Sequence, residues 1–266
     1  MFVLGAALLA YIVLNVGSWW ALRQLPAVPE VVVVPAGGDA VEGERLASIL
    51  GCKGCHGADL GGAEDCFERP GQYRLTCPNI TAARDLYTDR DLVILLRHGR
   101  KIDGALVDFM PWDMYAQLTD SDLANVIAYV RAAPYVDKPA LHDSQYSLAV
   151  RWQMLRGEYP WQNDLADYDT KPLDGPAERG RYLASVSCPE CHAPNLRGYE
   201  GDTAPSLTVV QAYPPEAFAR LMREGITMTG RESASGLMTA VARDRFSHFT
   251  AEEVVALKAY FDQRTP

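Results

Sequence analysis

The sequence predicts an all-α protein with two tandem domains after an N-terminal transmembrane helix. Three observations lead to this fold class: the chain opens with a long apolar run, apolar residues recur at helical spacing in both halves, and one order of segments occurs twice. We place an anchor over residues 1–24, a proline-containing linker over 25–38, a first domain over 39–136, an interdomain linker over 137–175 and a second domain over 176–266.

The apolar run covers residues 2–22 and is interrupted only by Asn15 and Ser18. At 1.5 Å per residue it spans about 30 Å, the thickness of a bilayer core. Trp19 and Trp20 stand at its far end, where amphipathic rings favour the interface. A cleaved signal peptide is the alternative, but its apolar region is normally shorter, and no small-residue cleavage site follows here before the proline-containing stretch Pro26–Pro35. We therefore predict an uncleaved single-pass anchor.

Each half then shows the same series of helices. An amphipathic helix covers residues 43–48 in the first half and 180–185 in the second, and a later helix ends at Gly99 or Gly225. A closing helix begins near Thr119 or Thr250 with an acid three residues on, which is a capping box. The apolar face of these closing helices comprises Leu123, Val126, Ile127 and Val130 in the first half, and Val254, Leu257 and Phe261 in the second.

The composition is that of an ordinary globular protein, with 48% of 266 residues hydrophobic and 22% charged. The net charge of −9 argues against nucleic acid as a partner, because no basic excess is present to offset a phosphate backbone. It is compatible with a partner protein that presents a basic docking face.

Four of the six cysteines lie in two C-x-x-C-H motifs, which run Cys52-Lys53-Gly54-Cys55-His56 and Cys188-Pro189-Glu190-Cys191-His192. This pattern is the attachment signature of c-type haem. Two thiols three residues apart on one helical turn reach both vinyl groups of one porphyrin, and the adjacent histidine is aimed at the iron. A zinc site would normally need four ligands, and a thioredoxin-type motif would need a βαβ context. The sequence therefore predicts two covalently attached haem c groups.

With a helix, the motif, a proline loop, a methionine loop and a closing helix, each half resembles a class I cytochrome c domain. The proline loops are Pro78-Asn79-Ile80-Thr81 and Pro205-Ser206-Leu207-Thr208. The chain also resembles the membrane-bound cytochrome subunits of bacterial periplasmic dehydrogenases, through residues 179–183 and Arg151-Trp152-x-x-Leu155. Those subunits often carry three haems, whereas this chain has two motifs.

The resemblance implies a set of haem-binding residues. Met110, in a Met-Pro motif ahead of the closing helix, and Met238, at the corresponding place, are expected as the sixth ligands. Met114 is the alternative in the first half; Met228 and Met222 are alternatives in the second, with Met222 more typical of a core. The full expected set is Cys52, Cys55, Cys188 and Cys191 for attachment, His56, Met110, His192 and Met238 for the irons, and the Pro78 and Pro205 carbonyls as histidine acceptors.

The first half is longer between its histidine and its proline loop than the second. Thirteen residues separate His192 from Pro205, but 22 separate His56 from Pro78, and the nine extra residues sit where Cys66 and Cys77 occur. We predict a disulfide between these two, because haem attachment places the chain in an oxidising compartment. Loop entropy assigns it about 2–3 kcal/mol. The alternative is a thiol pair reserved for a further cofactor.

The predicted interdomain linker is rich in aromatics: Tyr146, Trp152, Tyr159, Trp161 and Tyr168. Residues 151–155 predict a short helix within it. We expect the linker to pack across both domains and hold the haems close together, and the alternative is an ordinary interdomain wrap. The three remaining histidines, His98, His142 and His248, are expected at the surface or in structural roles.

Histidine and methionine ligands leave no vacant iron position, which favours electron transfer over substrate chemistry. We predict an electron carrier, without a small-molecule substrate, between a dehydrogenase or quinol-oxidising complex and an oxidase or other acceptor. The haem domains are expected in the periplasm, anchored in the bacterial cytoplasmic membrane, although Arg23 lies on that side against the positive-inside tendency. The alternatives are a dihaem peroxidase, with His98 or His248 as a replacement ligand, and a fixed subunit of a respiratory or photosynthetic complex.

Overall fold

The structure is a computed structural model that describes residues 2–21, 23, 28–107, 109–139, 141–158, 168–200 and 204–264. The chain divides into two compact units, and each contains part of the first half. The first unit consists of Met1–Ala36, Cys55–Asp113 and Val130–Asn163; the second consists of Gly37–Gly54, Met114–Tyr129 and Asp164–Pro266. The second unit therefore combines two helical regions of the first half with the whole second half. The domain boundaries taken from the sequence stay predictions.

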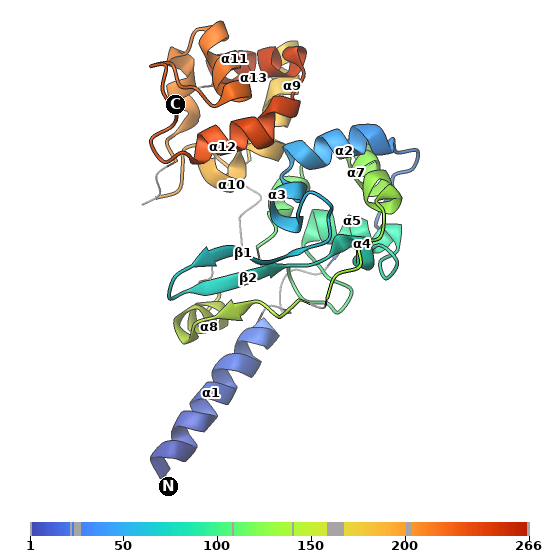
Figure 1. The fold of residues 1–266 in the computed structure, drawn as a ribbon, viewed down its shortest axis with the longest axis vertical. Helices are drawn as coiled ribbons and strands as arrows, with labels where there is room; N and C mark the ends of the chain where they lie inside the picture. The colour runs from blue at the N-terminus through green and yellow to red at the C-terminus, as the bar shows by residue number, and fades with distance from the viewer. Residues whose placement is uncertain are drawn as a thin grey trace. The chain divides into compact units, whose positions relative to one another are not determined.

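The first unit contains a small antiparallel sheet, so the prediction of an all-α protein is wrong (Figure 1). Strand β1 (Ala63–Arg69) pairs with β2 (Tyr73–Cys77), and β2 pairs with β3 (Gln145–Tyr146). The β1–β2 hairpin lies in the segment between His56 and Pro78, which is nine residues longer than its counterpart in the second half. In the sequence, Pro70-Gly71 is typical of a turn, and apolar residues alternate at Tyr73 and Leu75, both of which are buried. This pattern is too short to stand out beside the long helical patterns.

The predicted transmembrane helix is also wrong. Residues Phe2–Ala21 form helix α1, yet among the described residues no helix is long and apolar enough to cross a membrane. The last turns of α1 instead pack on α8 (Leu148–Leu155), where the Ser18 hydroxyl accepts a hydrogen bond from Arg151. The predicted location, with a single-pass anchor in the cytoplasmic membrane, is therefore wrong as well.

The other helices of the first unit connect the hairpin to the methionine loop. Helix α5 (Asp89–His98) begins at a capping box between Thr88 and Asp91 and ends at Gly99, whose φ of 62° is left-handed. This confirms the predicted helix end. The short helix α4 (Ile80–Ala83) follows the first proline loop, and α6 (Trp112–Tyr115), which runs on into the second unit, follows Met110.

The second unit is helical. Its elements are α2 (Ala40–Ile49), the start of α3 (Cys52–His56), most of α7 (Asp120–Ala132), α9 (Pro176–Ser187), α10 (Pro189–His192), η2 (Leu207–Ala212), α11 (Pro215–Glu224), α12 (Leu237–Asp244), η3 (Phe246–His248) and α13 (Ala251–Gln263). The predicted closing helices are confirmed as α7 and α13. The second predicted glycine stop is confirmed as well, since Gly225 caps α11 with φ 70°.

Both halves cross their first and last helices at a glycine. A Cβ added to Gly180 on α9 would lie 1.9 Å from the carbonyl oxygen of Ala256 on α13, and a Cβ on Gly43 in α2 would lie 1.9 Å from that of Asn125 on α7. Only glycine permits backbones to approach this closely. In Figure 1, α9 and α13 lie side by side in the second half.

Candidate haem-binding sites

The two motif histidines have the same hydrogen-bond environment. His56 ends α3, and its Nδ1 lies 2.8 Å from the carbonyl oxygen of Pro78. His192 ends α10, and its Nδ1 lies 2.8 Å from the carbonyl oxygen of Pro205. Since a carbonyl can only accept, Nδ1 carries the proton and Nε2 presents the lone pair that a metal binds. Both rings are thus held in the tautomer and orientation suited to an iron ligand.

The loop after each histidine is also duplicated. In each copy a glycine amide donates to the histidine carbonyl, and a leucine with left-handed φ both donates within the loop and accepts from the proline loop. The pairs are Gly62–His56 (2.8 Å), Leu60–Gly57 (2.9 Å) and Ile80–Leu60 (3.1 Å) in the first half, and Gly198–His192, Leu196–Ala193 and Leu207–Leu196 (all 2.9 Å) in the second. The two proline carbonyls are therefore placed by the same backbone scaffold.

The charge state of His56 follows from its surroundings. Burial lowers the pKa of His56, while its hydrogen bond to the Pro78 carbonyl acts in the opposite direction. The net lowering favours the neutral imidazole, which is the form that ligates iron.

The cysteines separate into two classes. Cys66 and Cys77 form the predicted disulfide, and the four motif cysteines are thiols. Burial raises the pKa of the Cys188 thiol to about 11, so it stays protonated at neutral pH and is unsuited to zinc or thiol-exchange chemistry as a thiolate. Within the described part of the chain, no three His, Cys, Asp or Glu side chains gather as a metal cluster. The thiols remain suited to thioether bonds with a porphyrin.

The loop that carries Met110 is supported by the inserted hairpin. Phe109 packs its ring on Phe67 of β1, with ring centroids 4.7 Å apart, and on Tyr73 of β2, at 5.5 Å. The carbonyl of Met110 accepts from the Trp112 amide at 2.7 Å, which closes a turn ahead of α6. Met110 itself is partly buried. The disulfide-linked hairpin therefore backs the segment on which the predicted ligand lies.

Met238 is supported differently. It lies in the first turn of α12, directly after the left-handed Gly236, and packs against the buried core of the second unit. When the nine extra residues of the first half are left out, the histidine-to-methionine separations in the two halves agree to within one residue. The roles of Met110 and Met238 as iron ligands stay predictions.

The alternative methionines have other environments. Met114 is completely enclosed by its neighbours, and Met222 is a member of the second unit's core, as predicted from its place in a helix. Met228 is exposed in a turn. Each therefore has an ordinary structural position.

The donor set fits haem c. Two thiols and an oriented imidazole lie on one short helical segment in each half, as thioether attachment and axial ligation require. In addition, the buried indole Nε1–H of Trp112, two residues after Met110, finds no acceptor among the described residues. A porphyrin propionate is an acceptor of the kind that this donor lacks.

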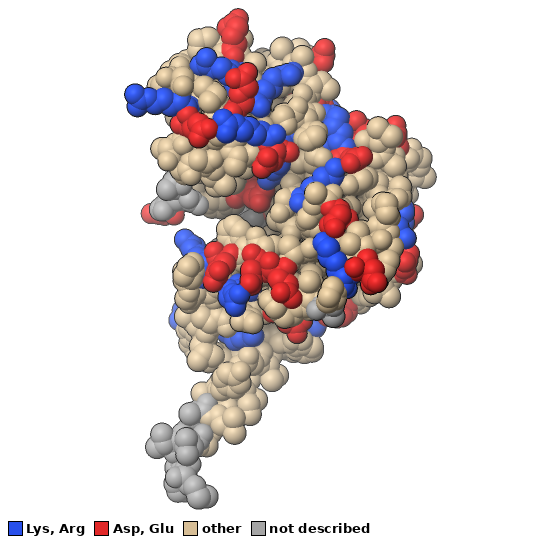
Figure 2. Space-filling view, in the orientation of Figure 1, with Lys and Arg blue, Asp and Glu red and all other residues tan. Residues whose placement is uncertain are grey.

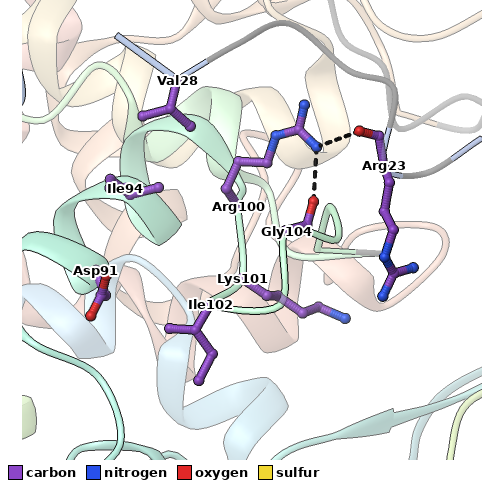
Figure 3. Close-up of a pocket in the computed structure, with 8 residues that line it drawn as sticks. All are labelled: Arg23, Val28, Asp91, Ile94, Arg100, Lys101, Ile102 and Gly104. Carbon is purple, nitrogen blue, oxygen red and sulfur yellow. Dashed lines mark hydrogen bonds between the residues drawn. The ribbon is translucent and has the colours of Figure 1, made fainter. Parts of the chain in front are cut away.

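A separate pocket of about 470 Å³ lies in the first unit and contains none of the predicted haem-binding residues (Figure 3). The guanidinium of Arg100 donates there to the carbonyls of Gly104, at 3.0 Å, and Arg23, at 3.4 Å. The guanidinium of Arg100 is therefore bonded to other residues that line the same pocket. This pocket adds no evidence for haem binding, which is inferred from the two motifs.

The remaining sequence predictions are placed as follows. His142 and His248 are exposed, as predicted, whereas His98 is partly buried and has its pKa lowered by burial, with Arg97 adding to the effect. The predicted linker helix is confirmed as part of α8. The linker aromatics that the structure describes are Tyr146 on β3, the exposed Trp152 on α8 and the buried Tyr168, while Tyr159 and Trp161 lie outside the described residues.

The sequence missed a reciprocal contact between the halves within the second unit. Arg45 on α2 pairs with Glu253 at the start of α13, at 2.8 Å, and Tyr182 on α9 donates to Asp122 at the start of α7, at 2.5 Å. Arg45 and Tyr182 each follow a crossing glycine by two residues, and both acids occupy the third position after the capping threonine. The matching positions of these four residues in the two halves could have marked them as related. The sequence pattern does not show, however, that each residue contacts the acid of the other half.

Comparison with known proteins agrees with the first site. Residues 40–134 match the model of the Cytochrome c family, so the chain contains a cytochrome c domain. The chain is 30% identical over 177 residues to the fructose dehydrogenase cytochrome subunit of Gluconobacter japonicus, an alignment that covers 57% of this chain and 34% of that protein. The chain thus spans about a third of the length of this relative.

Proposed function

We propose that this chain is an electron-transfer protein that carries two covalently bound haem c groups and passes electrons between a dehydrogenase and a second redox protein. The observation that carries the proposal is the duplicated 2.8 Å contact from each motif histidine to a proline carbonyl, beside a C-x-x-C pair. The disulfide between Cys66 and Cys77 is typical of an oxidising compartment such as the periplasm.

Each residue of the set has a defined task. The thiols of Cys52, Cys55, Cys188 and Cys191 would hold the porphyrins, and the two histidines, oriented by Pro78 and Pro205, would each ligate an iron. Met110 and Met238 supply the other ligand, which closes both irons to substrates and raises the reduction potential relative to bis-histidine ligation. A bound haem c supplies a one-electron couple. The chain is therefore a carrier and not itself a catalyst.

The kind of protein that donates electrons to this chain is inferred from the similar protein of Gluconobacter japonicus. That protein is named as the cytochrome subunit of a fructose dehydrogenase, and we infer a similar place for this chain beside a dehydrogenase of a small organic substrate. The net charge of −9 favours a partner with a basic docking face. Figure 2 shows acidic and basic side chains interspersed on the visible face, so any complementarity is local.

Mass spectrometry of the purified protein tests the haem count. The wild type is expected to carry the mass of two haems, and the paired changes Cys52→Ala with Cys55→Ala, or Cys188→Ala with Cys191→Ala, should each remove one. A wild type without two added porphyrins would disprove the proposal. Low-spin spectra from both haems support a carrier, whereas a native high-spin haem would indicate a peroxidase.

A further inference from the structure

Arg245, directly after α12, is a largely buried cation that contacts both haem-attachment regions. Its side chain is 13% exposed. Nη1 lies 2.7 Å from a carboxylate oxygen of Glu190, which stands between the two cysteines of the second motif. Nε donates at 2.9 Å to the carbonyl of Ile49, three residues before Cys52 of the first motif. All of these residues belong to the second unit.

The surroundings of this guanidinium are close-packed. A Cβ added to Gly51, which precedes Cys52 and has φ 84°, would lie 2.8 Å from the Arg245 Cζ. Nη2 is buried and has no acceptor among the described residues. The first half carries Met114 at the matching position, five residues before the capping threonine. The cation is therefore a feature of the second half alone.

Burial and pairing define the electrical effect of this residue. Burial by itself would lower the pKa of Arg245, but the attraction and hydrogen bond of Glu190 raise it, so the guanidinium stays charged. Its field is weakly screened, because the side chain is removed from solvent. The Glu190 side chain is 36% exposed and its charge is better screened. A positive charge beside the second motif stabilises the reduced iron, which carries one positive charge fewer.

We propose that Arg245 and Glu190 form a charge pair that sets the reduction potential of the second haem, with Arg245 raising the potential and Glu190 lowering it. This inference rests on the proposed function, in that it requires a haem attached at Cys188 and Cys191. It assigns to two residues outside the ligand set a tuning role that the first half lacks.

The test is a redox titration of the full-length dihaem protein carrying Arg245→Gln or Glu190→Gln. Removal of Arg245 leaves Glu190 unopposed, and should lower the ratio of reduced to oxidised second haem about tenfold at the wild-type midpoint, which is 59 mV for one electron. Removal of Glu190 should shift the midpoint in the opposite direction. The matched control is Arg243→Gln on α12, whose side chain is 49% exposed and pairs with the exposed Glu232 at 2.8 Å. The control should leave both midpoints unchanged.

Opposite shifts support the inference. Two shifts of the same sign, or none beyond that of Arg243→Gln, would overturn it, since a structural role alone does not invert with the sign of the deleted charge. If Arg245→Gln fails to fold, Glu190→Gln decides the matter alone by raising the midpoint or leaving it unchanged. Haem content is measured first by mass, so a missing second haem counts against the proposed function and is distinguished from a failure of the charge pair.

Discussion

The two halves of this protein hold their histidines in the same way and their methionines in different ways. The contacts to Pro78 and Pro205 are both 2.8 Å long. The Met110 loop, in contrast, is backed by an inserted hairpin through Phe109 and Phe67, whereas Met238 stands on a helix against the core. The difference indicates that the proposed haem attachment, which needs one orientation of the histidine ring, leaves the backbone little freedom. The support of a proposed methionine ligand, in contrast, can be built from unrelated elements.

The largest expected effect comes from removing a methionine. Met110→Ala should open the first haem to carbon monoxide in the reduced protein, with attachment intact, because the sixth iron position loses its ligand. Met238→Ala should do the same at the second haem. Carbon monoxide difference spectra measure both.

The control for each half is an enclosed methionine, Met114→Ala or Met222→Ala, which should lower stability by about 2–5 kcal/mol without opening the iron. If carbon monoxide still fails to bind a reduced ligand variant, the ligand assignment for that half is wrong.

The helix crossings test whether the halves share a scaffold. Gly43→Ala and Gly180→Ala each place a Cβ 1.9 Å from a backbone oxygen, so each should cost about 3 kcal/mol of unfolding free energy. Urea denaturation checks this. Gly5→Ala on α1, where a Cβ meets nothing within 4 Å, is the control. Unequal costs for Gly43 and Gly180 would show that the halves differ in packing as well as in methionine support.

The disulfide belongs to the first half alone. Cys66→Ser with Cys77→Ser opens a cross-link with a sequence separation of 11, and should lower the unfolding free energy of the first unit by about 2–3 kcal/mol. The absorption spectrum of the second haem should stay unchanged, and so should the urea concentration at which that spectrum is half lost. If both haem spectra are lost at equally lowered urea concentrations, the disulfide-linked hairpin does not support the Met110 loop separately from the second half.

The smallest expected effect is at the aromatic contact. Phe67→Ala should cost about 1 kcal/mol, because it removes two ring pairs, with Phe109 and with Tyr73, from a half-exposed position. It should also raise the carbon monoxide affinity of the first haem by loosening the loop. Leu237→Ala, an exposed change beside Met238, is the control in the second half. If Phe67→Ala changes stability and carbon monoxide affinity no more than Leu237→Ala does, the hairpin does not support the Met110 loop.

Local patterns carried most of what could be predicted. The motifs, the two glycine helix stops, the closing helices and the pairing of Cys66 with Cys77 are visible in short stretches of sequence, because each depends on residues that are close along the chain or few in number. The apolar N-terminal run was misinterpreted for the same reason: hydropathy is a local quantity, and the packing of Ser18 near Arg151 of α8 is not.

The chemistry that we propose for this protein can be predicted from the amino-acid sequence alone, since two thiols and a histidine at fixed spacing on one helical turn are the pattern of haem attachment in any fold. The groups that surround the two motifs, in contrast, depend on how distant segments pack. Arg45 meets Glu253 across 208 positions, and Arg245 meets Ile49 across 196. Such pairings depend on where helices cross, and crossing is set by the packing of whole faces, which no short stretch of sequence specifies.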